Sequence, residues 1–209
     1  MNSNTFEHFA RIGFQMHAVD TAYADGERPS TGSLKVQTTP VLKPEECRRL
    51  ITQLSKLGSR EGLVTSPTGA AVVDPDRYTA KEVLFNPAAA SFTWLIRRLG
   101  PYIAEASRSF GIPELKMVEA ARLVSYGQTG HFNWHPDSSA QVQRRLTLSL
   151  QLSPEATYSG GDLIILGQDG DWVCADRTQG AACLFPAPLF HRVMPVTHGR
   201  RSALVLWFY

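Results

Sequence analysis

The order of apolar and polar positions divides the chain into a helical part and a strand-rich part that meet near Gly111. Before that point, apolar residues recur every three or four positions in two segments. The first begins at Pro44, has two acidic residues in its first turn and ends at Gly58, which are typical helix boundaries. The second is expected over residues 87–110, with a kink at Pro101.

After Gly111 the spacing changes to short apolar runs separated by turn residues, most of them glycine. These runs cover residues 116–126, 131–135, 145–152, 162–166, 172–175, 181–185, 191–195 and 201–208. Many short strands separated by glycine-containing turns predict a sandwich, jelly roll or barrel. With helices packed on an outer face, the expected class is α+β.

The N-terminal third is predicted to support this core. Residues 1–33 are expected to form a partly mobile arm, with a short helix or packed segment followed by a loop over 21–33. A strand is expected over 34–42. The domain would then span 34–209, with helical support over 34–114 and the jelly-roll core over 115–209. Residues 62–86 contain glycines and prolines and are the best candidate for an irregular, substrate-covering loop.

The composition of the chain limits the number of domains, the kinds of partner and the cellular location that we expect. A chain of 209 residues suits one compact domain, and a net charge of +2 without a basic stripe gives no sign of a nucleic-acid partner. We find neither a membrane-spanning apolar stretch nor a secretory signal. Three cysteines without close spacing indicate free thiols in the cytoplasm. The oligomeric state stays open.

Three residues suggest a metal site. His135 and Asp137 are two positions apart, so on a strand both side chains point to one face. His191 begins a later run and can reach them from a neighbouring strand. Two histidines and one carboxylate leave one side of Fe(II) open. An isolated His-x-Asp pair is nevertheless common by chance, and a single histidine is more often structural than a ligand.

The surrounding residues strengthen the metal interpretation. The stretch from Arg122 through Tyr126 and Gly127 to His135-Pro-Asp137 resembles the Tyr…Gly…His-x-Asp block of prolyl-4-hydroxylase-type Fe(II)/2-oxoglutarate dioxygenases. Residues 152–163 follow the Leu-Ser…Tyr-x-Gly-Gly-x-Leu block, and residues 191–201 follow His-x-Val-x-Pro-Val…Gly-x-Arg. The three blocks occur in order over about half of the chain and are closest to bacterial PKHD-type hydroxylases.

This resemblance implies a double-stranded β-helix, or jelly roll, with His135, Asp137 and His191 as the iron ligands. It also implies that Arg201 binds the distal carboxylate of 2-oxoglutarate, which a guanidinium can meet with two parallel hydrogen bonds. Tyr126 corresponds to a tyrosine that reaches the cosubstrate. Gln151 stands where several relatives have another tyrosine, and this departure leaves the partner of the Arg201 ligand open.

The implied reaction uses Fe(II), O2 and 2-oxoglutarate, with ascorbate as a supporting reductant, and hydroxylates a C–H bond while releasing succinate and CO2. The substrate class stays broad: an amino acid, a peptidyl residue such as a prolyl residue, or a small metabolite. Arg122 and Trp207 share the pocket face by the two-residue period, so we hypothesise that Arg122 holds an anionic group and Trp207 walls the pocket. A zinc-type hydrolase and a non-catalytic binding module are the alternatives.

Overall fold

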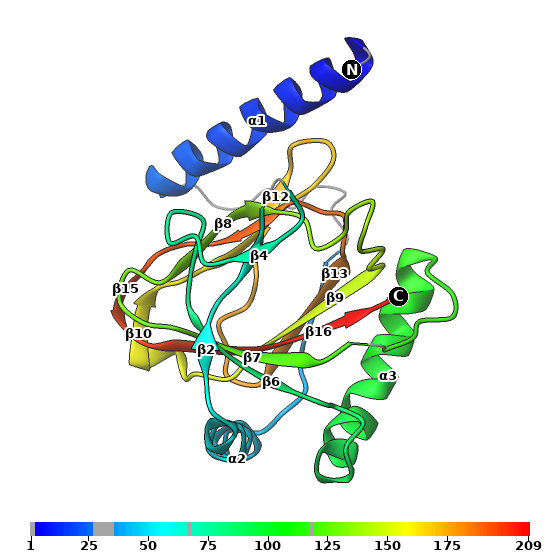
Figure 1. The fold of residues 1–209 in the computed structure, drawn as a ribbon, viewed down its shortest axis with the longest axis vertical. Coiled ribbons are helices and arrows are strands. Elements are labelled where there is room, and N and C mark those ends of the chain that lie inside the picture. The colour runs from blue at the N-terminus through cyan, green and yellow to red at the C-terminus, as the bar shows by residue number, and fades with distance from the viewer. Residues whose placement is uncertain (1–2, 27–35, 67, 118) are drawn as a thin grey trace.

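The computed structural model describes residues 3–26, 36–66, 68–117 and 119–209, and it shows two antiparallel sheets that face each other (Figure 1). The larger sheet contains, in spatial order, β1 (Gln37–Pro40), β13 (Ala181–Pro186), β9 (Leu146–Gln151), β16 (Arg201–Phe208), β7 (Ala121–Tyr126), β6 (Lys81–Phe85) and β2 (Arg60–Glu61). The smaller contains β12 (Trp172–Cys174), β11 (Leu163–Leu166), β14 (His191–Val193), β8 (His131–His135) and β5 (Tyr78–Thr79).

Two further strand pairs extend the sandwich. They are β10 (Tyr158–Gly160) with β15 (Val196–Gly199), and β3 (Val64–Thr65) with β4 (Ala71–Val72). The β10–β15 pair shifts register between Ser159 and Gly160. Gly160 has a φ of 69°, and a Cβ there would lie 2.2 Å from the carbonyl oxygen of Pro195. Only glycine therefore fits this bulge.

Helices cover the outer face of the larger sheet (Figure 1). These are α2 (Pro44–Leu54), which continues into the 3-10 turn η1 (Ser55–Leu57), and α3 (Thr93–Phe110), which follows η2 (Ala90–Phe92). Their apolar residues form one buried cluster with leucines of β9 and β16. In β9 the even-numbered leucines point to the helices, while the odd-numbered residues, Thr147 and Ser149, point into the sandwich.

The inner faces of the two sheets form a second core, which includes Val124, Leu163, Ile165 and Phe185. Helix α1 (Ser3–Ala24) lies on the far side of the smaller sheet (Figure 1). There Val19 packs with Ile164, Leu166 and Trp172. Strands that are covered on both faces, such as β11 with the sequence LIIL, are accordingly buried and apolar along their whole length.

The structure confirms the α+β class and the jelly-roll arrangement, and it corrects several expected boundaries. Helix α1 runs through Ala24, so the first four residues of the loop expected over 21–33 are helical. Asp25 and Gly26 form a turn, and residues 27–33 lie outside the described residues. The first strand covers Gln37–Pro40 rather than 34–42. The second predicted helix begins at Thr93 and continues through Pro101.

Residues 62–86 differ most from the expectation. They contain the strands β3, β4, β5 and β6 instead of one irregular covering loop. Strand β5 joins the smaller sheet beside β8, and β6 joins the larger sheet beside β7. The sandwich therefore draws strands from the region expected to give helical support, and these strands form walls of the interior pocket described below.

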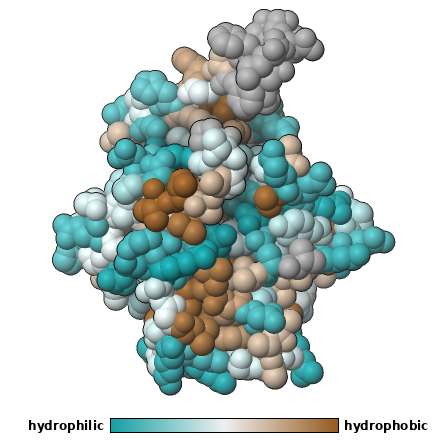
Figure 2. Space-filling model, in the orientation of Figure 1, coloured by the Kyte–Doolittle hydropathy of each residue, from teal (hydrophilic) through white to brown (hydrophobic). Residues whose placement is uncertain are grey.

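Among the described residues, no helix is long and apolar enough to cross a membrane. Exposed large apolar side chains include Leu57, Val72, Val73 and Leu84. On the face shown in Figure 2, hydrophobic surface forms patches that hydrophilic side chains separate. Such isolated patches are ordinary for a folded domain.

We predict that Leu150→Ala lowers the free energy of unfolding by about 2–5 kcal/mol, because Leu150 lies on β9 and is fully buried in the cluster that the larger sheet forms with the helices. Leu57→Ala is the matched control, since Leu57 is 57% exposed and should change stability by no more than about 0.5 kcal/mol. Urea unfolding of both variants measures the difference. Equal effects would contradict the proposed packing of helices on the larger sheet.

Candidate functional site

The two histidines and the aspartate expected to bind metal converge at the inner face of the smaller sheet. His135 ends β8, His191 begins β14, and the two residues are direct partners in the antiparallel register. Asp137 follows β8, and its backbone N–H donates to the carbonyl of Ala187 at 2.9 Å. One ligand atom from each of the three residues lies within 4.8 Å of the others.

Backbone contacts orient both imidazole rings. Nδ1 of His135 lies 2.7 Å from the carbonyl oxygen of Asn133, and Nδ1 of His191 lies 3.0 Å from that of Leu189. When each Nδ1–H donates to its carbonyl, each Nε2 presents a lone pair. These Nε2 atoms face Asp137, at 4.0 Å for His135 and 3.4 Å for His191. The Thr147 hydroxyl donates to Asp137 Oδ2 at 2.7 Å.

The protonation of these residues suits a metal ligand set. Burial, together with the neighbouring His191, lowers the pKa of His135 to about 3. For Asp137, burial alone would raise the pKa, but His191, His135 and the Thr147 hydrogen bond outweigh it, so the pKa is lowered. A neutral imidazole beside an ionised carboxylate is the state that binds a divalent cation. The donor set fits Fe(II).

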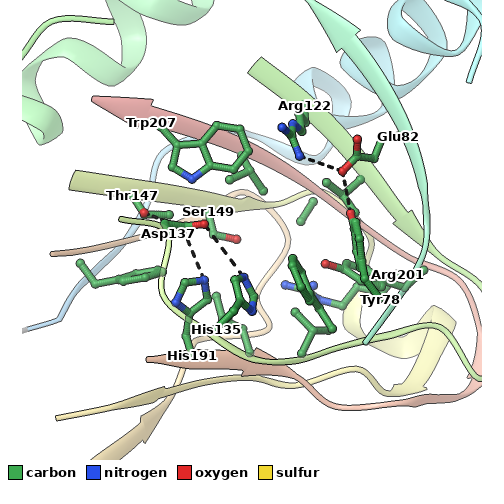
Figure 3. A pocket seen from close by; sticks show the side chains of 18 residues that line it. Tyr78, Glu82, Arg122, His135, Asp137, Thr147, Ser149, His191, Arg201 and Trp207 are labelled. Carbon is green, nitrogen blue, oxygen red and sulfur yellow. Dashed lines mark hydrogen bonds and ion pairs between the residues drawn. The ribbon is translucent and has the colours of Figure 1, made fainter. Parts of the chain in front are cut away.

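The three residues lie in a pocket lined by 18 residues between the two sheets (Figure 3). Arg201 and Tyr126 also line it, and they are direct partners across β16 and β7. Arg201 is only 5% exposed, and its guanidinium carbon lies 5.7 Å from the centre of the Tyr126 ring. At Gly161 a Cβ would come within 3.2 Å of Arg201 Cδ, so this glycine leaves room for the arginine.

Gln151, which stands where several relatives have another tyrosine, is not among the residues that line the pocket. Its Nε2 donates to the carbonyl of Ser153 at 2.9 Å and to the hydroxyl of Tyr158 at 3.1 Å. Burial raises the pKa of Tyr158, and the positive charges of Arg201 and Arg177 oppose that rise. Gln151 therefore supports Tyr158, which lies beside Arg201, and has no direct access to the pocket.

Arg122 and Trp207 both line the pocket, as the two-residue period predicted. The guanidinium of Arg122 lies 4.8 Å from the centre of the Trp207 ring. On its other side Arg122 Nη1 donates to Glu82 Oε1 at 3.1 Å, and the Tyr78 hydroxyl donates to the same oxygen at 2.9 Å. Glu82 and Tyr78 could not be predicted as pocket residues from the sequence, because both lie in the segment 62–86, expected to be irregular.

An aromatic stack links these residues to the histidines. The ring of Phe132 is stacked on His135 with centroids 3.5 Å apart and on Tyr78 with centroids 4.0 Å apart. Tyr78 in turn meets Tyr126 edge to face at 6.3 Å. Burial raises the pKa of Tyr126 far above its ordinary value, so its hydroxyl remains a hydrogen-bond donor at all physiological pH values.

The fold and the site together define a class. A jelly roll with two histidines, one aspartate and a buried arginine at its inner face has the form of a non-haem iron oxygenase. Residues 121–209 match the family model of the 2OG-Fe(II) oxygenase superfamily. This match supports the resemblance found in the sequence over residues 121–209.

Individual relatives narrow the comparison. A PKHD-type hydroxylase of Psychrobacter sp. is 40% identical over 73 residues, a match that covers 35% of this chain and 28% of that protein. A PKHD-type hydroxylase of Nitrosomonas europaea is 28% identical over 178 residues, which cover 80% of this chain and 74% of that protein. The chain thus spans less than a third of the first relative and about three quarters of the second.

Solved structures confirm the fold. A prolyl hydroxylase from Trichoplax adhaerens, in complex with a peptide fragment of the hypoxia inducible factor oxygen degradation domain, superposes with a TM-score of 0.70 at 14% identity, covering 100% of this chain and 94% of that one. A prolyl-4-hydroxylase of Pseudomonas putida superposes with a TM-score of 0.63 at 15% identity, covering 84% and 92%.

We predict that the metal-free protein loses stability as the pH falls below about 6.5. The unfolded chain then protonates His135, whereas the folded chain keeps it neutral down to about pH 3. Between about pH 7.5 and 5.5 this linkage removes about 1 kcal/mol of unfolding free energy. His135→Asn should show a smaller loss in urea unfolding at the two pH values, and His198→Asn, at an exposed position, should keep the wild-type dependence. An unchanged slope in His135→Asn would contradict this explanation.

Proposed function

We propose that this chain is an Fe(II)- and 2-oxoglutarate-dependent oxygenase that hydroxylates a C–H bond of an amino-acid, peptidyl or small-metabolite substrate. The observation that carries the proposal is the convergence of His135, Asp137 and His191 in the same pocket as a buried arginine, Arg201. The superfamily match and the relatives named as PKHD-type hydroxylases support it.

In this proposal His135 Nε2, His191 Nε2 and one Asp137 oxygen hold the iron. Iron and 2-oxoglutarate supply the oxidising chemistry when bound, with succinate and CO2 as the co-products. Thr147 keeps the Asp137 carboxylate turned toward the histidines, since its hydroxyl occupies one lone pair of Oδ2. The apolar lining, which includes Val124, Leu163 and Phe185, keeps bulk water away from this centre.

Arg201 orients the cosubstrate. Its guanidinium is buried at the pocket wall and can meet a carboxylate with parallel hydrogen bonds. Tyr126, its partner across the strands, donates a hydrogen bond to the same ligand through a hydroxyl that burial keeps protonated. Ascorbate keeps the iron reduced, and the protein acts in the cytoplasm without nucleic-acid or membrane partners.

A zinc-type hydrolase would leave Arg201 and Tyr126 without a role, although both face the pocket. A non-catalytic binding module would not need both histidine Nε2 atoms turned toward the aspartate. The residues that line the pocket therefore favour the oxygenase over either alternative.

We predict that the protein releases succinate from 2-oxoglutarate when Fe(II), ascorbate and O2 are present. His135→Ala should abolish this release, because two remaining ligands do not hold the metal. Metal binding measured by calorimetry under anaerobic conditions should fall in parallel. Succinate release that persists in His135→Ala, or that fails in the wild type under all metal conditions, would contradict the proposal.

Arg201→Lys should raise the KM for 2-oxoglutarate about 10- to 100-fold, because lysine keeps the charge but loses the paired hydrogen bonds. Arg48→Lys is the matched control, since Arg48 is exposed on α2, outside the pocket. Steady-state kinetics with varied 2-oxoglutarate measures both variants. An unchanged KM in Arg201→Lys would remove this residue from the cosubstrate site.

A further inference from the structure

One charged cluster of the pocket has no part in holding iron or cosubstrate. It consists of Glu82 on β6 and Arg122 on β7, neighbouring strands whose pocket faces lie side by side. In Figure 3 the two side chains lie on the opposite side of the pocket from His135 and His191. This arrangement places a second polar group opposite the metal ligands in an otherwise largely apolar cavity.

Glu82 fixes the position of Arg122. The Glu82 side chain is fully buried, and its Oε1 accepts hydrogen bonds from Arg122 Nη1 and from the Tyr78 hydroxyl. The Trp207 ring lies against the same guanidinium. A planar group held at one nitrogen and along one face retains little freedom, so its remaining edge points in a defined direction.

That remaining edge has no protein acceptor. Arg122 Nε is buried and has no hydrogen-bond partner among the described residues. Arg144, which also lies against Trp207, shows what the edge can do: its Nε and Nη2 donate to the two oxygens of Glu119 at 2.5 and 2.6 Å. Nε of Arg192 also has no hydrogen-bond partner among the described residues, and Nε of Arg177 has only an ion pair with Glu155 at 3.4 Å, but neither arginine lines the pocket.

The charges around Glu82 favour an anion at this edge. Arg60 Nη2 lies 3.4 Å from Glu82 Oε2, so two arginines surround one carboxylate and the cluster carries one excess positive charge. The Arg60 side chain is 45% exposed, so water screens much of its charge, whereas Arg122 faces the pocket and shares its carboxylate with Arg60. A neutral peptide carbonyl would compensate the Arg122 charge less than an anion does. A carboxylate compensates it and matches the two parallel donors of the fork.

We propose that the Nε–Nη2 edge of Arg122 binds a carboxylate of the substrate, with Glu82 as the positioning residue, so that the enzyme acts on a small carboxylic acid such as a free amino acid. The proposal rests on the proposed oxygenase function, and it selects free acids over internal residues of a polypeptide that carry no carboxylate. Arg201 remains the anchor of the cosubstrate.

The test uses the full chain with Fe(II) and 2-oxoglutarate under anaerobic conditions. Calorimetry measures the binding of a panel of small carboxylic acids, the free L-amino acids among them, each paired with its carboxamide. At least one acid should bind the wild type about 10- to 100-fold more tightly than its carboxamide. Arg122→Lys and Arg122→Met should remove most of this preference, whereas Arg48→Lys should retain it.

Glu82→Gln tests the positioning role. It keeps the shape of the side chain but removes the charge that holds Arg122, so the same acid should bind more weakly while the affinity for 2-oxoglutarate changes less. Circular dichroism and the thermal unfolding midpoint identify any variant that fails to fold. Arg122→Lys, which keeps the positive charge, then provides the independent comparison.

Three results would overturn the inference: carboxamides that bind as tightly as the acids, no acid in the panel that binds the wild type, or an Arg122→Lys variant in which 2-oxoglutarate loses more affinity than the acid. The last would make Arg122 a cosubstrate anchor. Acid binding is measured without turnover, so the result of this binding experiment does not depend on whether the protein releases succinate. Failure of succinate release alone would count against the oxygenase function and not against carboxylate binding at Arg122.

Discussion

The strict alternation of side chains along the central strands is the constraint on which this structure depends. In β7, β9 and β16 alternate residues point to opposite faces of the sheet: one set packs against α2 and α3, and the other set faces the pocket side. The same strand thus supplies leucine to the core and arginine, threonine or tryptophan to the site. A shift of one residue in register would exchange the two sets, so that charges would enter the helix interface. Core packing therefore also holds the site in place.

This shared scaffold explains how so many polar groups stay inside the protein. The carboxylates of the pocket meet partners from other elements: Glu82 meets Arg122 from β7, and Asp137 meets the histidines of β8 and β14. Unpaired, such groups would destabilise the fold by several kcal/mol each. The strand pairing of the sheet places these polar side chains next to each other. The arrangement of charges in the pocket therefore follows from the backbone hydrogen bonding between strands.

The sequence was most informative where a residue pattern and a strand period coincided. His135 and Asp137 could be predicted to share a site because two positions separate them, and Arg201 because it ends a recognisable block. Glu82 could not be predicted, since β6 is short and follows a segment rich in turn residues. Once β6 is known to be a strand, its alternation places Val83 and Phe85 toward the helices and Glu82 toward the pocket. Gln151 shows a different limit of prediction from the sequence. The two-residue period assigns it to the face of β9 that carries Thr147 and Ser149, but its amide is held by the nearby Ser153 carbonyl and Tyr158 hydroxyl.

The geometry of one strand also limits what the pocket can accept. Tyr126 and Arg122 lie four residues apart on the same face of β7, a separation of about 13 Å along the strand. Tyr126 pairs with Arg201 at the cosubstrate end, and Arg122 pairs with Val205 toward the Trp207 end. A substrate anchored at Arg122 must place its reacting C–H between these two points. For the carboxylate anchor proposed at Arg122, this span of the strand therefore fits a short molecule whose carboxylate and reacting carbon both lie within it.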